Sequence, residues 1–136
     1  MSKHTQKLIV DFDGVLHWYR KGWHDGTIYD EPVPGSQDAM RKFLEAGYEV
    51  IVFSTRAFDR VPYGDKFEPS QFDDMMVWFA QHGFPVGMKV WQGAGKPIGT
   101  AYIDDRAVAF KGHWNRCWLD VEQLRVEGTW QMGGTR

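Results

Sequence analysis

Apolar segments of strand length alternate with segments of helical periodicity along this chain, and this alternation restricts the fold more than any other feature. Strands are expected where apolar runs lie between turn residues, at residues 8–12, 48–54, 86–91 and 100–105, with a candidate fifth at 107–110. Helices are expected where apolar residues recur three and four positions apart, at about residues 35–47, 70–83 and 120–126. This order predicts an α/β fold of three layers, Rossmann-like, with a parallel sheet and helices on both faces.

The chain has the length of one domain, residues 1–136, and can bury roughly two-thirds of the surface that its unfolded form exposes. Residues 14–34 hold turn residues between two aromatic patches, which predicts a β-hairpin that projects from the end of the first strand. The tail at about residues 127–136 is expected to be loose, unless Trp130 packs on the body.

Composition narrows the class of protein further. The chain has 16 basic and 18 acidic side chains, so no strongly basic balance indicates nucleic-acid or membrane binding. The single cysteine, Cys117, fits a reducing cytosol, and its apolar neighbours favour a structural thiol over a catalytic one. The polar N-terminus lacks an apolar signal region, and no run approaches about eighteen apolar residues. We therefore expect a soluble, cytoplasmic protein with no membrane partner.

Chemically reactive side chains follow the expected strands at their carboxyl ends. Asp11 and Asp13 follow the first strand, residues 54–56 (Ser-Thr-Arg) end the second, and residues 104–105 (Asp-Asp) end the fourth. Lys96 lies in the loop before the fourth strand. Because functional crevices in open α/β sheets lie beyond the carboxyl ends of the strands, these side chains are expected to meet at one edge.

The spacing of Asp11 and Asp13 sends both side chains to the same side of the strand end. Two carboxylates at about 4 Å repel by roughly 4 kcal/mol at an effective dielectric constant near 20. A chain tolerates this repulsion when a cation lies between them or when one acid keeps its proton for chemistry. Acids, a hydroxyl and a lysine together suit a phosphoryl group and Mg²⁺, which prefers hard oxygen ligands. The five histidines show no zinc-ligand spacing, and His17, His24 and His113 are expected at the surface.

From about residue 7 to residue 110 the chain resembles the haloacid dehalogenase (HAD) superfamily of phosphohydrolases. Four motifs of that superfamily occur in order: "DFDG" from Asp11, "IVFST" from Ile51, the lysine of "GKP" at Lys96, and "YIDD" from Tyr102. A D-x-D pattern alone is weak evidence, whereas four motifs at the correct strand ends are specific.

The resemblance implies a role for each catalytic candidate. Asp11 would be the nucleophile that forms an aspartyl-phosphate, and Asp13 would protonate the leaving oxygen and then activate water. Ser54 would hold the oxygens of the phosphoryl group, and Lys96 would pair with Asp11 and the phosphate.

The resemblance also implies a Mg²⁺ cofactor and a substrate-binding set. The metal ligands would be carboxylates and one backbone carbonyl (that of Asp13), from residues Asp11, Asp13, Asp104 and Asp105. The substrate-binding candidates follow the motifs or lie in the hairpin: Thr55, Arg56, Gly14 and Trp18.

Asp13 also discriminates between reactions within the superfamily. The haloalkanoate-cleaving members lack an acid at this position, and the ion-pumping members carry "DKTG" there, so "DFDG" favours hydrolysis of a phosphomonoester. A binding or scaffolding module that keeps the fold without turnover is the alternative.

No inserted cap domain is expected, because the hairpin leads directly into the helix at Gly35 and the third strand leads directly to Lys96. The hairpin (the flap of the superfamily), the loop at residues 57–69 or a partner subunit in a homo-oligomer would then have to close the site. An open site can admit a nucleotide, a nucleic-acid end or a small phosphorylated metabolite. Trp18, Tyr19 and Trp23 would either stack on a base or hold the hairpin together.

Overall fold

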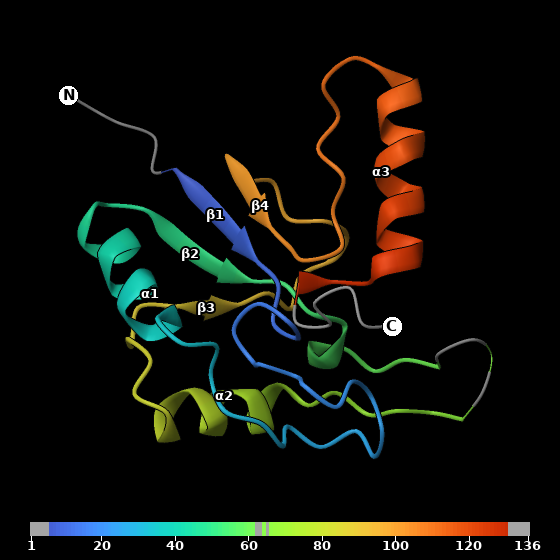
Figure 1. Ribbon diagram of the computed structural model, residues 1–136. Helices are drawn as coiled ribbons and strands as arrows, with labels where there is room; N and C mark the ends of the chain where they lie inside the picture. The colour runs from blue at the N-terminus through green and yellow to red at the C-terminus, as the bar shows by residue number, and fades with distance from the viewer. Residues whose placement is uncertain (1–5, 62–63, 65, 131–136) are drawn as a thin grey trace.

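The computed structural model describes residues 6–61, 64 and 66–130, and it confirms an α/β fold with a parallel sheet (Figure 1). All three strand pairs of the four-stranded sheet are parallel, in the order β3-β2-β1-β4. The strands are β1 (Lys7–Val10), β2 (Glu49–Val52), β3 (Lys89–Val90) and β4 (Ala101–Ile103). The helices are α1 (Ser36–Glu45), α2 (Phe72–Gln81) and α3 (Trp114–Glu127), with a short 3-10 helix, η1 (Thr55–Ala57), after β2.

The core lies between one face of the sheet and the helices α1 and α2. In the parallel register Leu8 faces Val50 and Val10 faces Val52, so these four side chains share one face. Met40 of α1 joins their buried cluster, as do residues of α2 that include Met75 and Trp78. Burial of this apolar stripe is the main force that holds β1 and β2 in register, because a shift by one residue would expose it.

The opposite face of the sheet is covered by a loop. Ile9 and Ile51 point to that face and are buried. A Cβ atom at Gly99 would lie only 2.6 Å from Cγ1 of Ile9, so the loop before β4 packs directly on β1 and needs glycine there.

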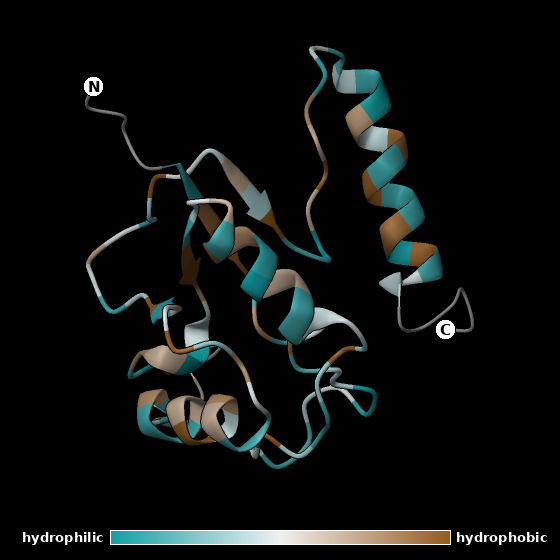
Figure 2. Cartoon of the chain, turned by 90° about the vertical axis from the view of Figure 1, so that its left-hand side faces the viewer, coloured by the Kyte–Doolittle hydropathy of each residue, from teal (hydrophilic) through white to brown (hydrophobic). Residues whose placement is uncertain are grey.

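Helix α3 departs from the sequence prediction in both length and placement. It begins six residues before the expected start at residue 120, and it stands apart from the other helices in Figures 1 and 2. Its side chains are mostly exposed, with Trp118 66% accessible. The expectation of helices packed on both faces is therefore wrong for α3, because helical periodicity does not state which surface an apolar stripe will meet. Within the described chain, no helix has both the length and the apolarity of a membrane span.

The segment at residues 14–34 pairs with itself only near its base. The Trp18 N–H donates to the carbonyl of Glu31 (2.9 Å), and the Val33 N–H donates to the carbonyl of Leu16 (2.8 Å). An isolated antiparallel bridge joins His17 and Pro32, and the remainder of this fully described segment consists of turns, bends and residues without regular structure, so the predicted β-hairpin does not form as two paired strands. Residues 107–110 form no strand.

The chain returns to the sheet edge after α3. The indole N–H of Trp130 donates to the carbonyl of Gly14 at 2.6 Å, so the conditional prediction that Trp130 packs on the body is confirmed. The prediction of a loose tail falls, from residue 131 to residue 136, outside the described residues.

Candidate functional site

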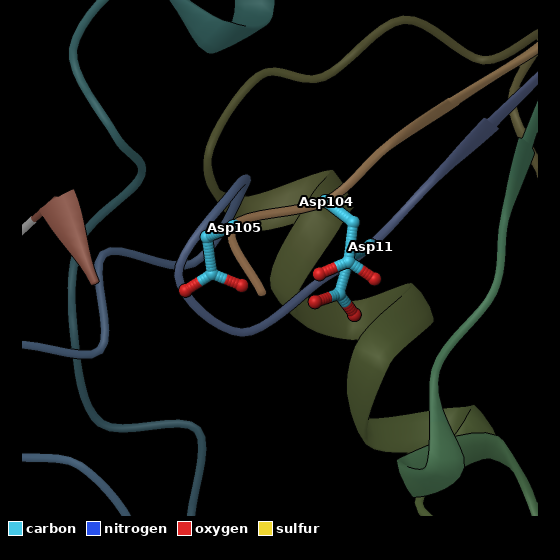
Figure 3. A group of neighbouring side chains, drawn as sticks. All are labelled: Asp11, Asp104 and Asp105. Carbon is cyan, nitrogen blue, oxygen red and sulfur yellow. The ribbon is translucent and has the colours of Figure 1, made fainter. Parts of the chain in front are cut away.

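Three carboxyl groups meet where β1 and β4 end. Asp11 follows β1, while Asp104 and Asp105 follow β4, and the Asp11 N–H donates to the carbonyl of Ile103 at 2.9 Å. Each acid offers one oxygen, and these oxygens all lie within 4.8 Å of one another (Figure 3). The parallel pairing of β1 with β4 thus brings together residues that are more than ninety positions apart in the sequence. We call Asp11, Asp104 and Asp105 the acidic triad.

The electrostatics of the acidic triad are unfavourable without a cation. Burial and the charges of Asp104, Asp105 and Asp13 together raise the pKa of Asp11 to about 7, against a backbone hydrogen bond from Phe12 that lowers it. Burial also raises the pKa of Asp105, with a contribution from the charge of Asp104. Desolvation and like charges both disfavour the ionised carboxylates.

A metal ion fits this arrangement. Carboxylate oxygens are the ligands that hard divalent cations prefer. Oδ1 of Asp105 is buried and has no hydrogen-bond partner among the described residues, so a lone pair is left without a donor. The acidic triad can hold a metal ion, because a cation between the carboxyl groups would offset both the repulsion and the unmet acceptor.

Asp13 lies outside the acidic triad, although it is only two positions from Asp11. Its Oδ1 lies 2.8 Å from Nδ1 of His17, and its Oδ2 lies 2.7 Å from Nε of Arg56. The side chain of Asp13 is 22% exposed, so it is not completely closed off from solvent. The chain itself therefore supplies the partners that compensate the charge of Asp13.

Arg56 is a buried cation with fixed partners. Its side chain is 1% exposed, and Nη1 donates to the carbonyl of Gly26 (2.8 Å) and to Oε1 of Gln71 (3.1 Å). Its guanidinium carbon lies 5.0 Å from the ring centroid of Trp23. Nη2 is buried and has no partner within the described parts of the chain. This environment makes Arg56 a link between β2, α2 and the 14–34 segment, not an open substrate ligand.

The remaining substrate-side candidates have varied surroundings. Ser54 is buried, and its Oγ accepts a hydrogen bond from the Arg56 N–H at 3.2 Å, which caps η1. Thr55 is exposed beside it. Gly14 has φ 82°, a left-handed value that favours glycine at this sharp turn, and its carbonyl receives the Trp130 indole. Trp18 is half-buried, and the guanidinium carbon of Arg20 lies 4.0 Å from its ring centroid.

Lys96 is not brought to the acidic triad. Its amine lies 4.3 Å from the ring centroid of Tyr102, and it forms no ion pair within 4.0 Å with any carboxylate of the described residues. The Tyr102 hydroxyl donates to the carbonyl of Pro97 at 2.6 Å, which holds the loop along β4. The expected pairing of Lys96 with Asp11 is therefore absent from this conformation.

One residue beside the site was misplaced by sequence reasoning, and the place of a second was foreseen only as packing on the body. His17 was expected at the surface, but it is completely buried, so that expectation is wrong. Trp130 lines a cavity of about 320 Å³ next to Asp104 and Asp105. The signal for His17 was its position six residues after Asp11, close enough in the chain to fold back over the strand end.

Comparisons with known proteins give no name for this arrangement: no family model, no curated protein and no solved structure matches the chain.

Proposed function

We propose that this protein is a Mg²⁺-dependent phosphomonoester hydrolase of the HAD type, and that it acts through an aspartyl-phosphate. The observation that carries the proposal is the acidic triad at the carboxyl ends of two adjacent parallel strands, with Asp13 held separately beside it. The four motifs of the sequence supply the reaction class. The sheet is compatible with such a fold, and its finer features, including a flap at residues 14–34, belong to the proposal.

In this proposal the acidic triad and the backbone carbonyl of Asp13 would hold a Mg²⁺ ion. When bound, it neutralises the charge that otherwise keeps a carboxylate nucleophile away from a phosphate dianion. Asp11 then attacks with one carboxylate oxygen, whose bond to phosphorus forms as the bond from phosphorus to the leaving oxygen breaks. Asp13 has to carry a proton when the ester binds; it gives this proton to the leaving oxygen, so that an alcohol departs, and the second half of the reaction restores it.

The second half of the reaction restores Asp11. Asp13, now a carboxylate, takes a proton from a water molecule as the water oxygen attacks phosphorus. The bond between phosphorus and the Asp11 oxygen breaks, and inorganic phosphate leaves with the Asp11 carboxylate regenerated. One ester and one water thus give one alcohol and one phosphate.

Ser54 and Lys96 would hold the oxygens of the phosphoryl group. Ser54 already lies at the end of β2, whereas Lys96 has to leave the ring of Tyr102 to reach the triad. We expect this movement when substrate adds negative charge at the sheet edge. The position of Lys96 is also the observation that favours the alternative, a binding or scaffolding module without turnover.

The substrate in this proposal is the phosphate of a nucleotide or of a nucleic-acid end, and a small phosphorylated metabolite would be admitted in the same way. Trp23 is 47% exposed beside Arg56 and offers a ring face for stacking on a base. Without a cap domain, the 14–34 segment or a second subunit would exclude water from the site.

The test is a panel of phosphate esters assayed with Mg²⁺ for the wild type, Asp11→Asn and a matched control, Asp38→Asn. Asp38 is an exposed acid on α1, far from the triad in sequence and paired with Arg41. Asp11→Asn is nearly isosteric but a poor nucleophile, so phosphate release should fall to background while Asp38→Asn retains it. Equal activity in the wild type and Asp11→Asn would reject the proposal.

A further inference from the structure

Each carboxyl oxygen of Asp13 contacts a residue that has no role in the motifs or in the proposed reaction. His17 approaches one carboxyl oxygen and Arg56 the other, at 2.8 and 2.7 Å. His17 comes from the 14–34 segment and Arg56 from η1 after β2. We call Asp13, His17 and Arg56 the Asp13 clamp.

The tautomer of the neutral His17 ring follows from its two hydrogen bonds. Nε2 of His17 lies 3.0 Å from the backbone nitrogen of Asp30, an N–H that can only donate, so Nε2 must be the unprotonated acceptor. In the neutral ring the proton is then on Nδ1, which donates to Oδ1 of Asp13. His17 therefore acts as a hydrogen-bond donor of fixed orientation toward the carboxyl group.

Packing prevents the His17 ring from turning away. The ring is fully buried and stacks on Phe12 at 5.4 Å between centroids, with the edge of Trp78 at 5.6 Å. The Trp78 indole N–H donates to the carbonyl of Asp30 at 3.0 Å, so the residue whose backbone N–H donates to Nε2 is itself anchored to α2. Rotation of the ring would break its hydrogen bonds and leave buried polar atoms unpaired.

Arg56 fixes the second oxygen with equal rigidity. Its Nη1 donates to Gly26 and Gln71, and its backbone N–H donates to Ser54, so neither the main chain nor the side chain is free. Each oxygen of Asp13 accepts one of the clamp's hydrogen bonds and keeps another lone pair for a further contact. The partly exposed side chain of Asp13 leaves room for such a contact with a substrate.

We propose that His17 and Arg56 are positioning residues that fix the carboxyl group of Asp13 for proton transfer to the leaving oxygen, an inference that rests on the proposed function. Proton transfer needs the carboxyl oxygen within hydrogen-bond reach of the leaving oxygen, and small misplacements are costly in rate. A side chain held at both oxygens by buried partners meets that need. The inference adds to the reaction two residues that do not touch the phosphoryl group.

The readout is the dependence of kcat on the leaving group. Departure of a strongly basic alkoxide needs protonation, whereas nitrophenolate leaves readily without it. In His17→Leu, kcat for an alkyl phosphate should fall about 100-fold, and kcat for p-nitrophenyl phosphate should fall much less. KM should stay nearly unchanged for both esters. His17→Asn can keep a side-chain N–H near the place of Nδ1, so it should recover much of the alkyl-phosphate activity.

Arg20→Ala serves as the structural control. Arg20 binds Asp30 in the same segment and does not contact Asp13, so its loss weakens the segment without touching the clamp directly. Melting curves show whether each variant folds. Should His17→Leu fail to fold, Arg56→Lys provides the same test, because it keeps the charge but changes how Asp13 is held.

Nitrogen-15 NMR of the wild-type protein checks the clamp without any assay of activity. The spectrum should show His17 with its proton on Nδ1, and a proton on Nε2 would overturn the inference. If the wild type is active but His17→Leu or Arg56→Lys loses activity equally on all esters, as we expect for Arg20→Ala, the positioning role alone is overturned. A wild type that hydrolyses no ester overturns the proposed function and this role with it.

Discussion

Asp11 and Asp13 lie two positions apart at the end of β1, yet their carboxyl groups have opposite surroundings. Asp11 lies among other carboxyl groups, with the backbone N–H of Phe12 as its hydrogen-bond donor. Asp13 has a nitrogen of His17 at one oxygen and a nitrogen of Arg56 at the other. The first group is short of positive charge, whereas the second is compensated within the chain. The surroundings of Asp11 therefore suit a ligand from outside the chain, whereas those of Asp13 fix the orientation of its carboxyl group.

The largest expected difference between Asp11 and Asp13 is the pH dependence of the free energy of unfolding in metal-free protein. Burial, together with the charges of the neighbouring carboxylates, raises the pKa of Asp11 from 3.8 to about 7, so the folded state binds this proton more tightly than the unfolded state. The stability that Asp11 contributes is complete below about pH 4 and is lost as the pH rises to about 7, on the order of 4 kcal/mol. Unfolding free energies in EDTA at several pH values, for the wild type and Asp11→Asn, measure it. Identical pH dependence in the two proteins would contradict the expectation.

Asp13→Ala should destabilise the protein by about 3 kcal/mol, because it leaves the buried guanidinium of Arg56 without its charge partner. Denaturant unfolding at neutral pH measures this loss. Asp38→Ala removes an exposed acid paired with Arg41 and should cost far less. If both variants lose the same small amount, Asp13 is not compensated as the clamp requires.

Asp105→Asn should have the opposite sign in metal-free protein and raise the free energy of unfolding by about 1 kcal/mol. The substitution removes one charge from the acidic triad and replaces a carboxyl group whose pKa burial already raises. Thermal melts in EDTA at pH 7.5 provide the measurement. A clear loss of stability would indicate that the carboxylate makes favourable contacts that the triad does not explain.

The smallest effect concerns Trp130, which connects the end of the described chain to Gly14. Gly14 directly follows Asp13 and is the first residue of the 14–34 segment. Trp130→Phe keeps an aromatic ring but removes the indole N–H that donates to the Gly14 carbonyl. We expect a loss of about 1 kcal/mol, the usual net value of one hydrogen bond. Chemical unfolding of Trp130→Phe beside Trp114→Phe, a change at an exposed position of α3, measures the difference.

The acidic triad could be predicted because strand order and chain direction decide it. Any parallel sheet that places β1 beside β4 brings Asp11 next to Asp104 and Asp105, whatever the loops do. The Asp13 clamp could not be predicted in this way. His17 reaches Asp13 through the packing of an irregular segment on Phe12 and Trp78, and no periodic pattern encodes such a contact.

The positions of Lys96 and of α3 could not be predicted from periodic patterns either. The position of Lys96 depends on one hydrogen bond between Tyr102 and Pro97 and on the approach of Gly99 to Ile9. The apolar positions of α3 satisfy a helical pattern, but the pattern does not determine whether a side chain such as Trp118 is buried, and in the structure it is mostly exposed. The four strands and three helices were therefore predictable from local sequence, although the candidate strand at residues 107–110 and the hairpin at residues 14–34 do not form, while the placement of loops and of the last helix depends on contacts between distant residues.

The melting temperature with and without Mg²⁺ tests the central claim, that the acidic triad is a Mg²⁺ site, most directly. Wild-type protein and Asp105→Asn would be melted at pH 7.5 in EDTA and at increasing millimolar Mg²⁺. A ligand at a hundred times its dissociation constant stabilises the native state by about 2.7 kcal/mol, which raises the melting temperature of a domain of this size by several degrees. We predict this rise in the wild type and its near-complete loss in Asp105→Asn. No rise in the wild type, together with no bound Mg²⁺ at the highest concentration, would contradict the account.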